Sequence, residues 1–464
     1  MIKPIMINNK TKFFWGTAVL FLISYILGID LIIPLFIITV YIFFRSRNLN
    51  YPVANLLNLT LLFVIMLAIG YSILKQGRSV FYIPFVVMPM LATLLFGGLE
   101  ISILLSLVSA VTLASLAGGH FYLLVLFLIS AISSSLLVLG ARRRIVIIRA
   151  GLFVGIIQAL SLFLARRFLV NLPGQYLLLL INGFASAIIV IGVLPVFEFL
   201  FRTVTDVSLL ELADFNQPLL QRMIMEAPGT YHHSLIVGNL SEAACRQVGA
   251  NALLARIGAY YHDIGKLEKA DYFSENQNIA SSRHDDLSPT MSKLVIMNHV
   301  KEGIELARRY KLNPRLVDFI RQHHGNSLVY YFYRRALEEI EEDQEIKEEG
   351  FRYPGPKPDT KEAAIVLLAD SVEAATRALK DLSLSKIEEV VHKVINNKFI
   401  DGQLDECDLT LKDLEKISAI FVRILSGMYH GRISYPEVSN SENNHKRSSK
   451  ENSPKPEEDK GPRP

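Results

Sequence analysis

The stretch Ala259-Tyr260-Tyr261-His262-Asp263-Ile264-Gly265-Lys266 decides the fold of the second half of the chain. It ends an apolar run with helical spacing that begins at Leu253, and Gly265 permits a turn before Lys266. The simpler interpretation of one His-Asp pair is a helix whose polar end caps itself. The alternative is a metal site, because neutral imidazole and carboxylate are common metal ligands. Such a site needs further ligands elsewhere in the chain.

The composition predicts a membrane protein with more than one domain. The chain has 464 residues, 51% of them hydrophobic, and its mean hydropathy is positive. Apolar runs with few acids extend to about Phe201-Arg202, and a composition typical of soluble domains follows. Two cysteines, Cys245 and Cys407, exclude a disulfide framework and fit a reducing compartment. A net charge of +4 gives no support for binding polymeric nucleic acid, and no such partner is expected.

Residues 1–202 are predicted to form a polytopic transmembrane region of seven or eight helices. The apolar runs lie near 13–28, 31–45, 57–75, 79–97, 99–117, 120–139, 145–168 and 176–201. The first two are short and could form one broken helix. With eight spans, most basic loop residues, including Arg142-Arg143-Arg144, fall on the cytoplasmic side of the cell membrane, although Lys75, Arg78, Arg166 and Arg167 do not. Scarce ionisable residues within the runs favour an anchor or sensor over a transporter.

The rest of the chain predicts an all-α fold, with a helical membrane domain followed by a cytoplasmic all-helical domain. Residues 203–225 predict a coupling helix or a plain linker between the two. Residues 226–436 show helical periodicity without strand alternation. After Tyr435-Pro436, the composition predicts a disordered tail over 437–464.

Several side chains of the second half have metal-ligand chemistry: His233, His262, Asp263, His299, His323, His324 and Asp370. Alone, a histidine at a helix entrance, such as His233 before a helix over about 234–248, is more often a surface residue. His323 and His324 can address one metal only if their helix end unwinds, because neighbours on a helix diverge by about 100°. A buried Asp370 needs a cation or strong donors.

Seven ligands exceed the needs of one metal, and they divide over two metals if Asp263 bridges them. Two metals about 3.5–4 Å apart can generate hydroxide near neutral pH and hold phosphoryl oxygens during in-line phosphodiester hydrolysis. Lys266, one turn after His262-Asp263, is placed to meet an anion.

Six motifs follow one another: Tyr231-His-His-Ser234, His262-Asp-Ile-Gly-Lys266, Asn298-His-Val-Lys301, His323-His-Gly325, Arg352-Tyr-Pro-Gly-Pro-Lys-Pro358 and Leu368-Ala-Asp-Ser-Val-Glu373. Together they resemble the seven-transmembrane HD-domain phosphodiesterases of the PgpH type. The resemblance covers about residues 206–436 and, in layout, the membrane region. This family usually has a large extracellular domain after its first membrane helix, whereas only Gly28-Ile-Asp30 separates the first two apolar runs here, so that domain is expected to be absent.

The resemblance implies a cytoplasmic HD domain that cleaves cyclic di-AMP to pApA with two iron or manganese ions. One metal would bind His233, His262, Asp263 and Asp370. The other would bind Asp263, His299, His323 and His324. Lys266 would contact the scissile phosphate, and a metal-bridging water or hydroxide would be the nucleophile.

Three alternatives stay open. Hydrolases of cyclic di-GMP typically carry Gly-Tyr-Pro after the histidine pair, whereas Gly325 is followed here by Asn-Ser-Leu. A one-metal nucleotide or alarmone hydrolase would leave His299, His323 and His324 unexplained. The third alternative is a membrane receptor that binds a nucleotide without cleaving it. The sequence leaves the oligomeric state open, a homodimer included.

Overall fold

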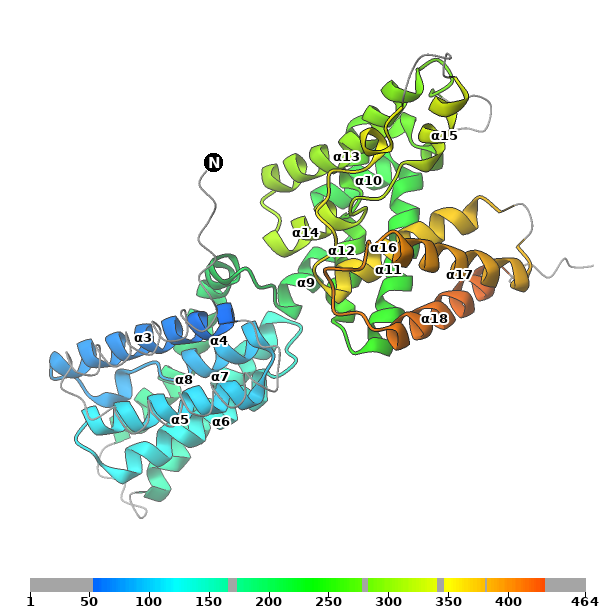
Figure 1. Cartoon of the computed structure of the whole chain (residues 1–464). Helices are drawn as coiled ribbons and strands as arrows, with labels where there is room; N and C mark the ends of the chain where they lie inside the picture. The colour runs from blue at the N-terminus through cyan, green and yellow to red at the C-terminus, as the bar shows by residue number, and fades with distance from the viewer. Residues whose placement is uncertain (1–52, 166–172, 278–282, 340–345, 380–381, 430–464) are drawn as a thin grey trace, which may run out of the picture.

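The computed structural model describes residues 53–165, 173–277, 283–339, 346–379 and 382–429. The regular elements of these residues are all helices, and their only β-contact is an isolated bridge between Leu328 and Arg352. They form two bodies joined near Phe201, as Figure 1 shows. The prediction of an all-α fold is confirmed. The two apolar runs before residue 53 and the tail after residue 436 lie outside the described residues.

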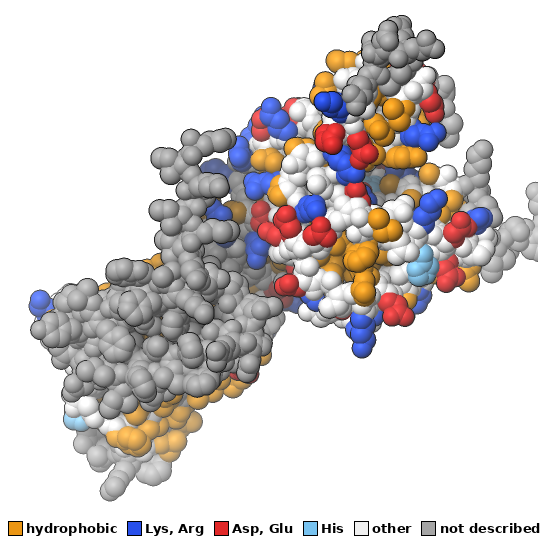
Figure 2. Space-filling view, viewed as in Figure 1, with side chains coloured by type: hydrophobic (Ala, Val, Ile, Leu, Met, Phe, Trp, Pro, Cys, Tyr) orange, Lys and Arg blue, Asp and Glu red, His pale blue; other side chains and the backbone are white. Residues whose placement is uncertain are grey.

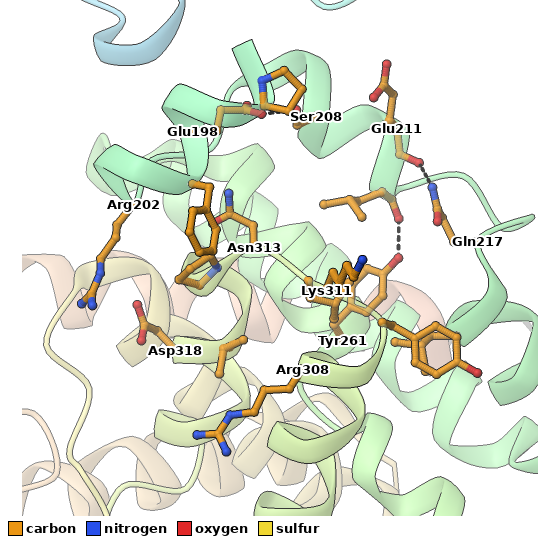
Figure 3. A pocket seen from close by; sticks show the side chains of 18 of the residues that line it. Glu198, Arg202, Ser208, Glu211, Gln217, Tyr261, Arg308, Lys311, Asn313 and Asp318 are labelled. Atoms are coloured by element: carbon orange, nitrogen blue, oxygen red, sulfur yellow. Dashed lines mark hydrogen bonds between the residues drawn. The ribbon is translucent and has the colours of Figure 1, made fainter. Parts of the chain in front are cut away.

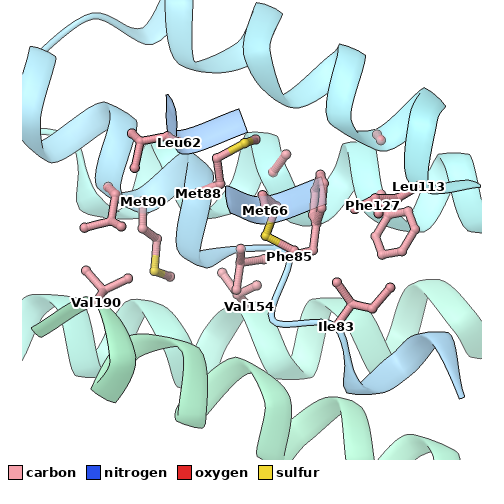
Figure 4. Packing of buried hydrophobic residues seen from close by; sticks show 14 of the residues in the cluster. Leu62, Met66, Ile83, Phe85, Met88, Met90, Leu113, Phe127, Val154 and Val190 are labelled. Atoms are coloured by element: carbon pink, nitrogen blue, oxygen red, sulfur yellow. The ribbon is translucent and has the colours of Figure 1, made fainter. Parts of the chain in front are cut away.

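The first body is a bundle of apolar helices: α3 (Val53–Lys75), the 3-10 turn η1 (Val80–Tyr82), α4 (Val87–Phe96), α5 (Leu99–Leu116), α6 (Phe121–Val138), α7 (Arg144–Ala165) and α8 (Pro173–Phe201). Within the described residues, α3, α6, α7 and α8 are long and apolar enough to cross a membrane. Their inward faces share one core that includes Met66, Phe85 and Val154 (Figure 4). Figure 2 shows hydrophobic side chains along the described lower edge of this body, as expected for helices that face lipid.

The predicted crossing at 79–97 is wrong as a continuous span. The turn η1 ends at Tyr82 and α4 begins only at Val87. Pro84 explains the break, because a proline lacks the backbone N–H and disfavours helical geometry in Ile83 before it. The ten residues of α4 extend about 15 Å, half the apolar thickness of a bilayer. The hydropathy of this run shows that it is apolar but does not show that its helix is broken.

Glycines bring α7 and α8 into backbone contact. A Cβ atom on Gly151 would lie 2.6 Å from the carbonyl oxygen of Gly183, and one on Gly155 would lie 2.8 Å from that of Leu180. Gly151 and Gly155 are four residues apart and share one helix face, the spacing typical of tight helix pairs in membranes. The two helices therefore form a closely packed hairpin.

The described residues of the second body form ten α-helices: α9 (Asp206–Leu212), α10 (Pro218–Glu226), α11 (Pro228–Val248), α12 (Ala252–Tyr261), α13 (Pro289–Arg309), α14 (Pro314–Gln322), α15 (Tyr330–Glu338), α16 (Lys361–Arg377), α17 (Leu384–Ile400) and α18 (Leu411–Tyr429). The 3-10 segments η2 (Ile264–Tyr272) and η3 (Ser274–Asn276) follow α12, and η4 (Glu348–Phe351) precedes α16. Residues 363–370 of α16 are all buried, so this helix forms the centre of the domain.

Local start signals account for several of these helices. The Ser288 hydroxyl accepts a hydrogen bond from the Met291 amide, and the Asn313 side chain accepts one from the Arg315 amide. A proline follows each capping residue at the first helical position, a combination that favours a helix start. The predicted start of the helix after His233 is wrong, because α11 already begins at Pro228, a residue favoured at the first helical position. His233 therefore lies inside α11 and not at its entrance.

The connection between the two bodies is helical and fastened to the membrane bundle. Glu198, near the end of α8, accepts hydrogen bonds from the backbone amide and hydroxyl of Thr205 at 2.7 and 2.6 Å, and from the Ser208 hydroxyl at 2.8 Å. Arg144, at the start of α7, donates two hydrogen bonds to Glu211 of α9, at 2.6 and 2.8 Å. Residues 203–225 thus contain two short helices. Their role in coupling the bodies stays a prediction.

Candidate metal centre

The seven side chains singled out in the sequence meet in the second body. They form two groups, one of His233, His262, Asp263 and Asp370, the other of Asp263, His299, His323 and His324. Within each group, one potential ligand atom of every residue lies within 4.8 Å of the others. All are buried except His324, which is partly exposed. The division equals the one that the family resemblance implied.

Helix ends deliver most of these side chains. His262 directly follows α12, and the chain then turns so that Asp263 leaves the helix. His323 ends α14, and the chain turns through His324 to Gly325, which has a φ of +55°. The helix end therefore unwinds at this point, which allows both imidazoles to join the same group.

Asp263 stands between the two groups with one oxygen toward each. Its Oδ2 atom lies 3.1 Å from His262 Nε2 and 3.6 Å from His233 Nε2. Its Oδ1 atom lies 3.4 Å from His299 Nε2 and 3.5 Å from His323 Nε2. Burial alone would raise the pKa of Asp263, but its interactions with His262 and Lys266 hold it well below its usual value. The ionised carboxylate is thus the geometric link between the groups.

The ring orientations fit metal binding. The Nδ1 atoms of His262, His299 and His323 lie 2.6, 2.6 and 3.0 Å from the backbone carbonyl oxygens three residues earlier. A carbonyl oxygen only accepts hydrogen bonds, so each Nδ1 carries the proton and each Nε2 offers a lone pair. His262 Nε2 has no hydrogen-bond partner in the described part of the chain. A buried nitrogen lone pair without a hydrogen-bond partner suits a cation.

His299 and His323 give the clearest case. Their Nε2 atoms lie 3.2 Å apart. Burial lowers the pKa of His299 to about 4, so this ring is neutral near neutral pH. Two imidazoles that each carry a single proton, on Nδ1, cannot hydrogen-bond to each other through Nε2. A bound cation would resolve this contact, and the residues present therefore fit a metal.

Glu373 is a residue that the sequence analysis did not single out. It lies one turn after Asp370 on α16, is 1% exposed, and accepts a hydrogen bond from His233 Nδ1 at 2.6 Å. Burial would lower the pKa of His233, but the hydrogen bonds to Asp370 and Glu373 raise it to about 9 in the absence of metal. A carboxylate behind a ligating histidine fixes its tautomer and increases its basicity. The Asp370-x-x-Glu373 spacing, which places both on one helix face, was the available signal.

Replacing Glu373 with Gln should weaken metal binding about 10–100-fold, because the charge behind His233 is lost while the shape is kept. Competition with a chelator of known affinity measures the change. Glu389→Gln is the matched control, since Glu389 is exposed on α17 and pairs with Lys386. Equal metal affinity in the two variants would reject the positioning role of Glu373.

Lys266 is held between two carboxylates. Its Nζ atom lies 2.7 Å from Asp263 Oδ2 and 2.7 Å from Glu275 Oε1. Burial would lower the pKa of Lys266, but these acids raise it above its ordinary value. Burial would likewise raise the pKa of Glu275, and Lys266 lowers it to about 2. Glu275, also missed in the sequence, keeps the ammonium group at the edge of the cluster.

Gly265 allows the loop that carries Asp263 and Lys266 to touch α13. A Cβ atom at this position would lie 1.8 Å from the carbonyl oxygen of His299 and 2.5 Å from the amide nitrogen of Gly303. Both obstacles are backbone atoms, which cannot swing away as a side chain can. The glycine between His262-Asp263 and Lys266 is therefore required by the close approach of η2 to α13.

Tyr353 forms another wall of the centre. It belongs to the proline-rich stretch 352–358, and its ring stacks on that of His324 with 4.3 Å between the centroids. Its amide donates a hydrogen bond to the carbonyl oxygen of Ser327 at 3.0 Å. The stretch thus runs beside the turn that follows the histidine pair and limits the motion of the His324 ring.

Two family models match the chain in tandem. One, described as a 7TM receptor with intracellular HD hydrolase, matches residues 23–205. The other, described as an HD domain, matches residues 230–375.

The curated relatives point to the same group of proteins. The chain is 40% identical over 431 residues to the cyclic-di-AMP phosphodiesterase PgpH of Bacillus subtilis (strain 168), covering 89% of this chain and 60% of that protein. It is 40% identical over 321 residues to the protein of the same name from Listeria monocytogenes serotype 1/2a (strain 10403S), covering 68% of this chain and 44% of that protein. The chain therefore spans only part of the length of both relatives.

A solved structure also matches. The crystal structure of the L. monocytogenes phosphodiesterase PgpH HD domain in complex with cyclic-di-AMP is 43% identical, with 47% of this chain and all of that chain covered, at a TM-score of 0.45.

Proposed function

Because this chain belongs to the family of seven-transmembrane proteins with an HD hydrolase domain, we propose that it is a membrane-anchored phosphodiesterase that cleaves cyclic di-AMP to pApA. The observation that carries the proposal is the position of Asp263, with one carboxylate oxygen toward each of two histidine-rich groups. A carboxylate shared in this way suits two metals, the arrangement used for phosphodiester hydrolysis. The activity that the names of both curated relatives state supports the choice of substrate.

The ligand assignment and the metals belong to the same proposal. His233, His262, Asp263 and Asp370 would hold one metal, and Asp263, His299, His323 and His324 the other. Imidazole and carboxylate donors without thiolate suit iron or manganese. When bound, the two metals would activate a water for attack and stabilise negative charge on the phosphodiester.

The protein side chains then bind, orient and balance charge. Lys266, a permanent cation at the edge of the cluster, would attract the phosphodiester and stabilise the charge that develops on its oxygens. Glu373 would hold the His233 ring, and Tyr353 that of His324. Every member of this set is buried or partly buried, which strengthens its electrostatic interactions.

We also propose that the HD domain lies in the cytoplasm. Arg142, in the connection between α6 and α7, and Arg144, at the start of α7, contact Asp206 and Glu211 of α9. A basic connection between membrane helices normally faces the cytoplasm. The HD domain lies at the same end of the bundle, so it would share this side.

The full-length protein in detergent micelles, supplied with Mn²⁺ or Fe²⁺, should convert cyclic di-AMP to pApA. Chromatography of the products measures the reaction, and cyclic di-GMP is tested in parallel. Faster cleavage of cyclic di-GMP would reject the proposed substrate. Saturable binding of cyclic di-AMP with no product, and the same behaviour in Asp263→Ala, would favour a nucleotide-binding receptor over an enzyme.

Replacing Lys266 with Met should lower kcat about 10²–10³-fold while both metals stay bound, because a cation near the reacting phosphodiester is lost. Steady-state kinetics and metal analysis are measured on the same sample. Lys269→Met is the control, as Lys269 is an exposed lysine three residues further along η2. A kcat equal to that of the control would exclude Lys266 from transition-state stabilisation.

A further inference from the structure

A separate cavity of about 940 Å³ lies where the membrane bundle meets the HD domain (Figure 3). Its walls come from the end of α8, from α9, from the end of α12 and from the connection between α13 and α14. None of the seven candidate metal ligands lines it. The cavity is therefore distinct from the proposed catalytic centre.

The lining of this cavity is basic. It contains Arg144, Arg202, Arg308, Lys311 and Arg321. Glu211 neutralises Arg144, whereas the other four are exposed and form no ion pair with another residue that the structure describes. In Figure 3 the guanidinium groups of Arg202 and Arg308 extend toward the same side of the cavity.

The acids of the cavity do not balance these cations. The lining has three acids against five cations; Glu211 pairs with Arg144, and Glu198 accepts hydrogen bonds from Thr205 and Ser208. The remaining acid in the lining is Asp318, and burial raises its pKa even though arginines lie nearby. An excess of positive charge is left to face a ligand.

An apolar surface adjoins the cationic one. Phe199, in the last turn of α8, lines the cavity and is 73% exposed. Val196, one turn earlier, is 63% exposed, and Leu200 is 56% exposed. These residues lie on a helix long and apolar enough to cross the membrane, so their exposed faces are expected to meet acyl chains. The cavity thus lies at the membrane surface, where an apolar helix face meets a group of cations.

We propose that this cavity binds the phosphate headgroup of an acidic phospholipid from the leaflet that faces the HD domain. The phosphate would lie among Arg202, Arg308, Lys311 and Arg321, and the acyl chains would lie along Phe199 and Val196. Clustered basic residues beside a membrane helix recognise acidic headgroups. The exposed apolar end of α8 favours a lipid over a soluble phosphate, because a soluble phosphate has no acyl chains to contact this apolar surface.

A lipid in this position would contact both bodies. Tyr261, which precedes His262, lines the cavity and donates a hydrogen bond to the Leu212 carbonyl oxygen of α9 at 2.8 Å. Asn313, at the start of α14, donates one to the Thr203 carbonyl oxygen at 2.9 Å. Both hydrogen bonds join the segment 203–212 to the rest of the second body, and the headgroup would add a contact between this body and the end of α8.

Native mass spectrometry of the full-length protein, titrated with phosphatidylglycerol or phosphatidylcholine, tests the proposal without any activity measurement. The wild type should retain phosphatidylglycerol preferentially. The double variant Arg308→Gln/Lys311→Gln should bind it about thirtyfold more weakly, the effect expected for two cations near an acidic headgroup. The control Lys301→Gln/Arg309→Gln removes two exposed cations of α13 outside the cavity and should bind like the wild type.

Three results would overturn the proposal: equal retention of the two lipids, equal weakening in both double variants, or displacement of phosphatidylglycerol by an equal concentration of glycerol phosphate. The last result would assign the cavity to a soluble phosphate compound. Arg321→Gln, a single change in α14, repeats the test if the double variant does not fold. Circular dichroism and unchanged metal content establish that each variant is folded.

Discussion

Asp263→Asn should release metal from both groups and lower the rate of cyclic di-AMP hydrolysis by at least about 10³-fold, equivalent to several kcal/mol of transition-state stabilisation. The two oxygens of Asp263 lie 3.1–3.6 Å from the Nε2 atoms of four histidines. An amide keeps the size of the side chain but removes its charge. It also directs N–H groups toward one set of lone pairs, so neither metal keeps its shared ligand.

Elemental analysis and single-turnover kinetics on the same sample measure this effect. Asp370→Asn serves as a comparison, because Asp370 belongs to only one of the groups, and it should leave the second metal in place. Asp271→Asn, an exposed change nearby, controls for the loss of an acid. If Asp263→Asn retained two metals per chain, the bridging role of Asp263 would be wrong.

Gly265→Ala should destabilise the HD domain by about 3 kcal/mol or more, the range of severe overpacking. The added Cβ would lie 1.8 Å from the His299 carbonyl oxygen, so η2 must move away from α13. That movement would also separate Asp263 from His299. For a domain of this size, the expected fall in Tm is about 6–12 °C.

Thermal unfolding of the metal-loaded protein, followed by circular dichroism, measures this loss. Gly427→Ala is the matched control, because a Cβ on Gly427 in α18 meets no atom within 4 Å. Alanine favours a helix interior over glycine by about 0.5–1 kcal/mol, so the control should be unchanged or slightly more stable. A Gly265→Ala protein with wild-type Tm and two metals would show that the close approach of η2 to α13 is dispensable.

Local signals were sufficient for much of the fold. Ser288-Pro289 and Asn313-Pro314 mark the starts of α13 and α14 because capping is a matter of neighbouring residues. The prediction of a continuous span at 79–97 failed because hydropathy averaged over a stretch of sequence does not show where a helix breaks. In this run the average includes the break at Pro84.

The candidate site divides along similar lines. Imidazole and carboxylate groups can bind a metal, and this ability follows from the residue type alone. The seven candidate ligands could therefore be chosen from the sequence, and in the structure they lie together. Glu373 and Glu275 were not, because a glutamate acquires such a role only from the group it faces. Glu373 faces a histidine 140 residues away in the chain. The resemblance supplied the division of ligands, which residue types alone left open.

The helices α7 and α8 hold α9 at two separate places. Arg144, at the start of α7, donates a hydrogen bond to Glu211, and Glu198, near the end of α8, accepts one from the Thr205 amide. A helix bonded to its neighbours at one place can rotate about that contact, whereas a helix bonded at two places, such as α9, must move with them. Since the glycine contacts join α7 and α8 closely, a rotation of this pair in the bilayer should turn α9 with it, and with α9 the Leu212 carbonyl that holds Tyr261 beside the candidate ligand His262.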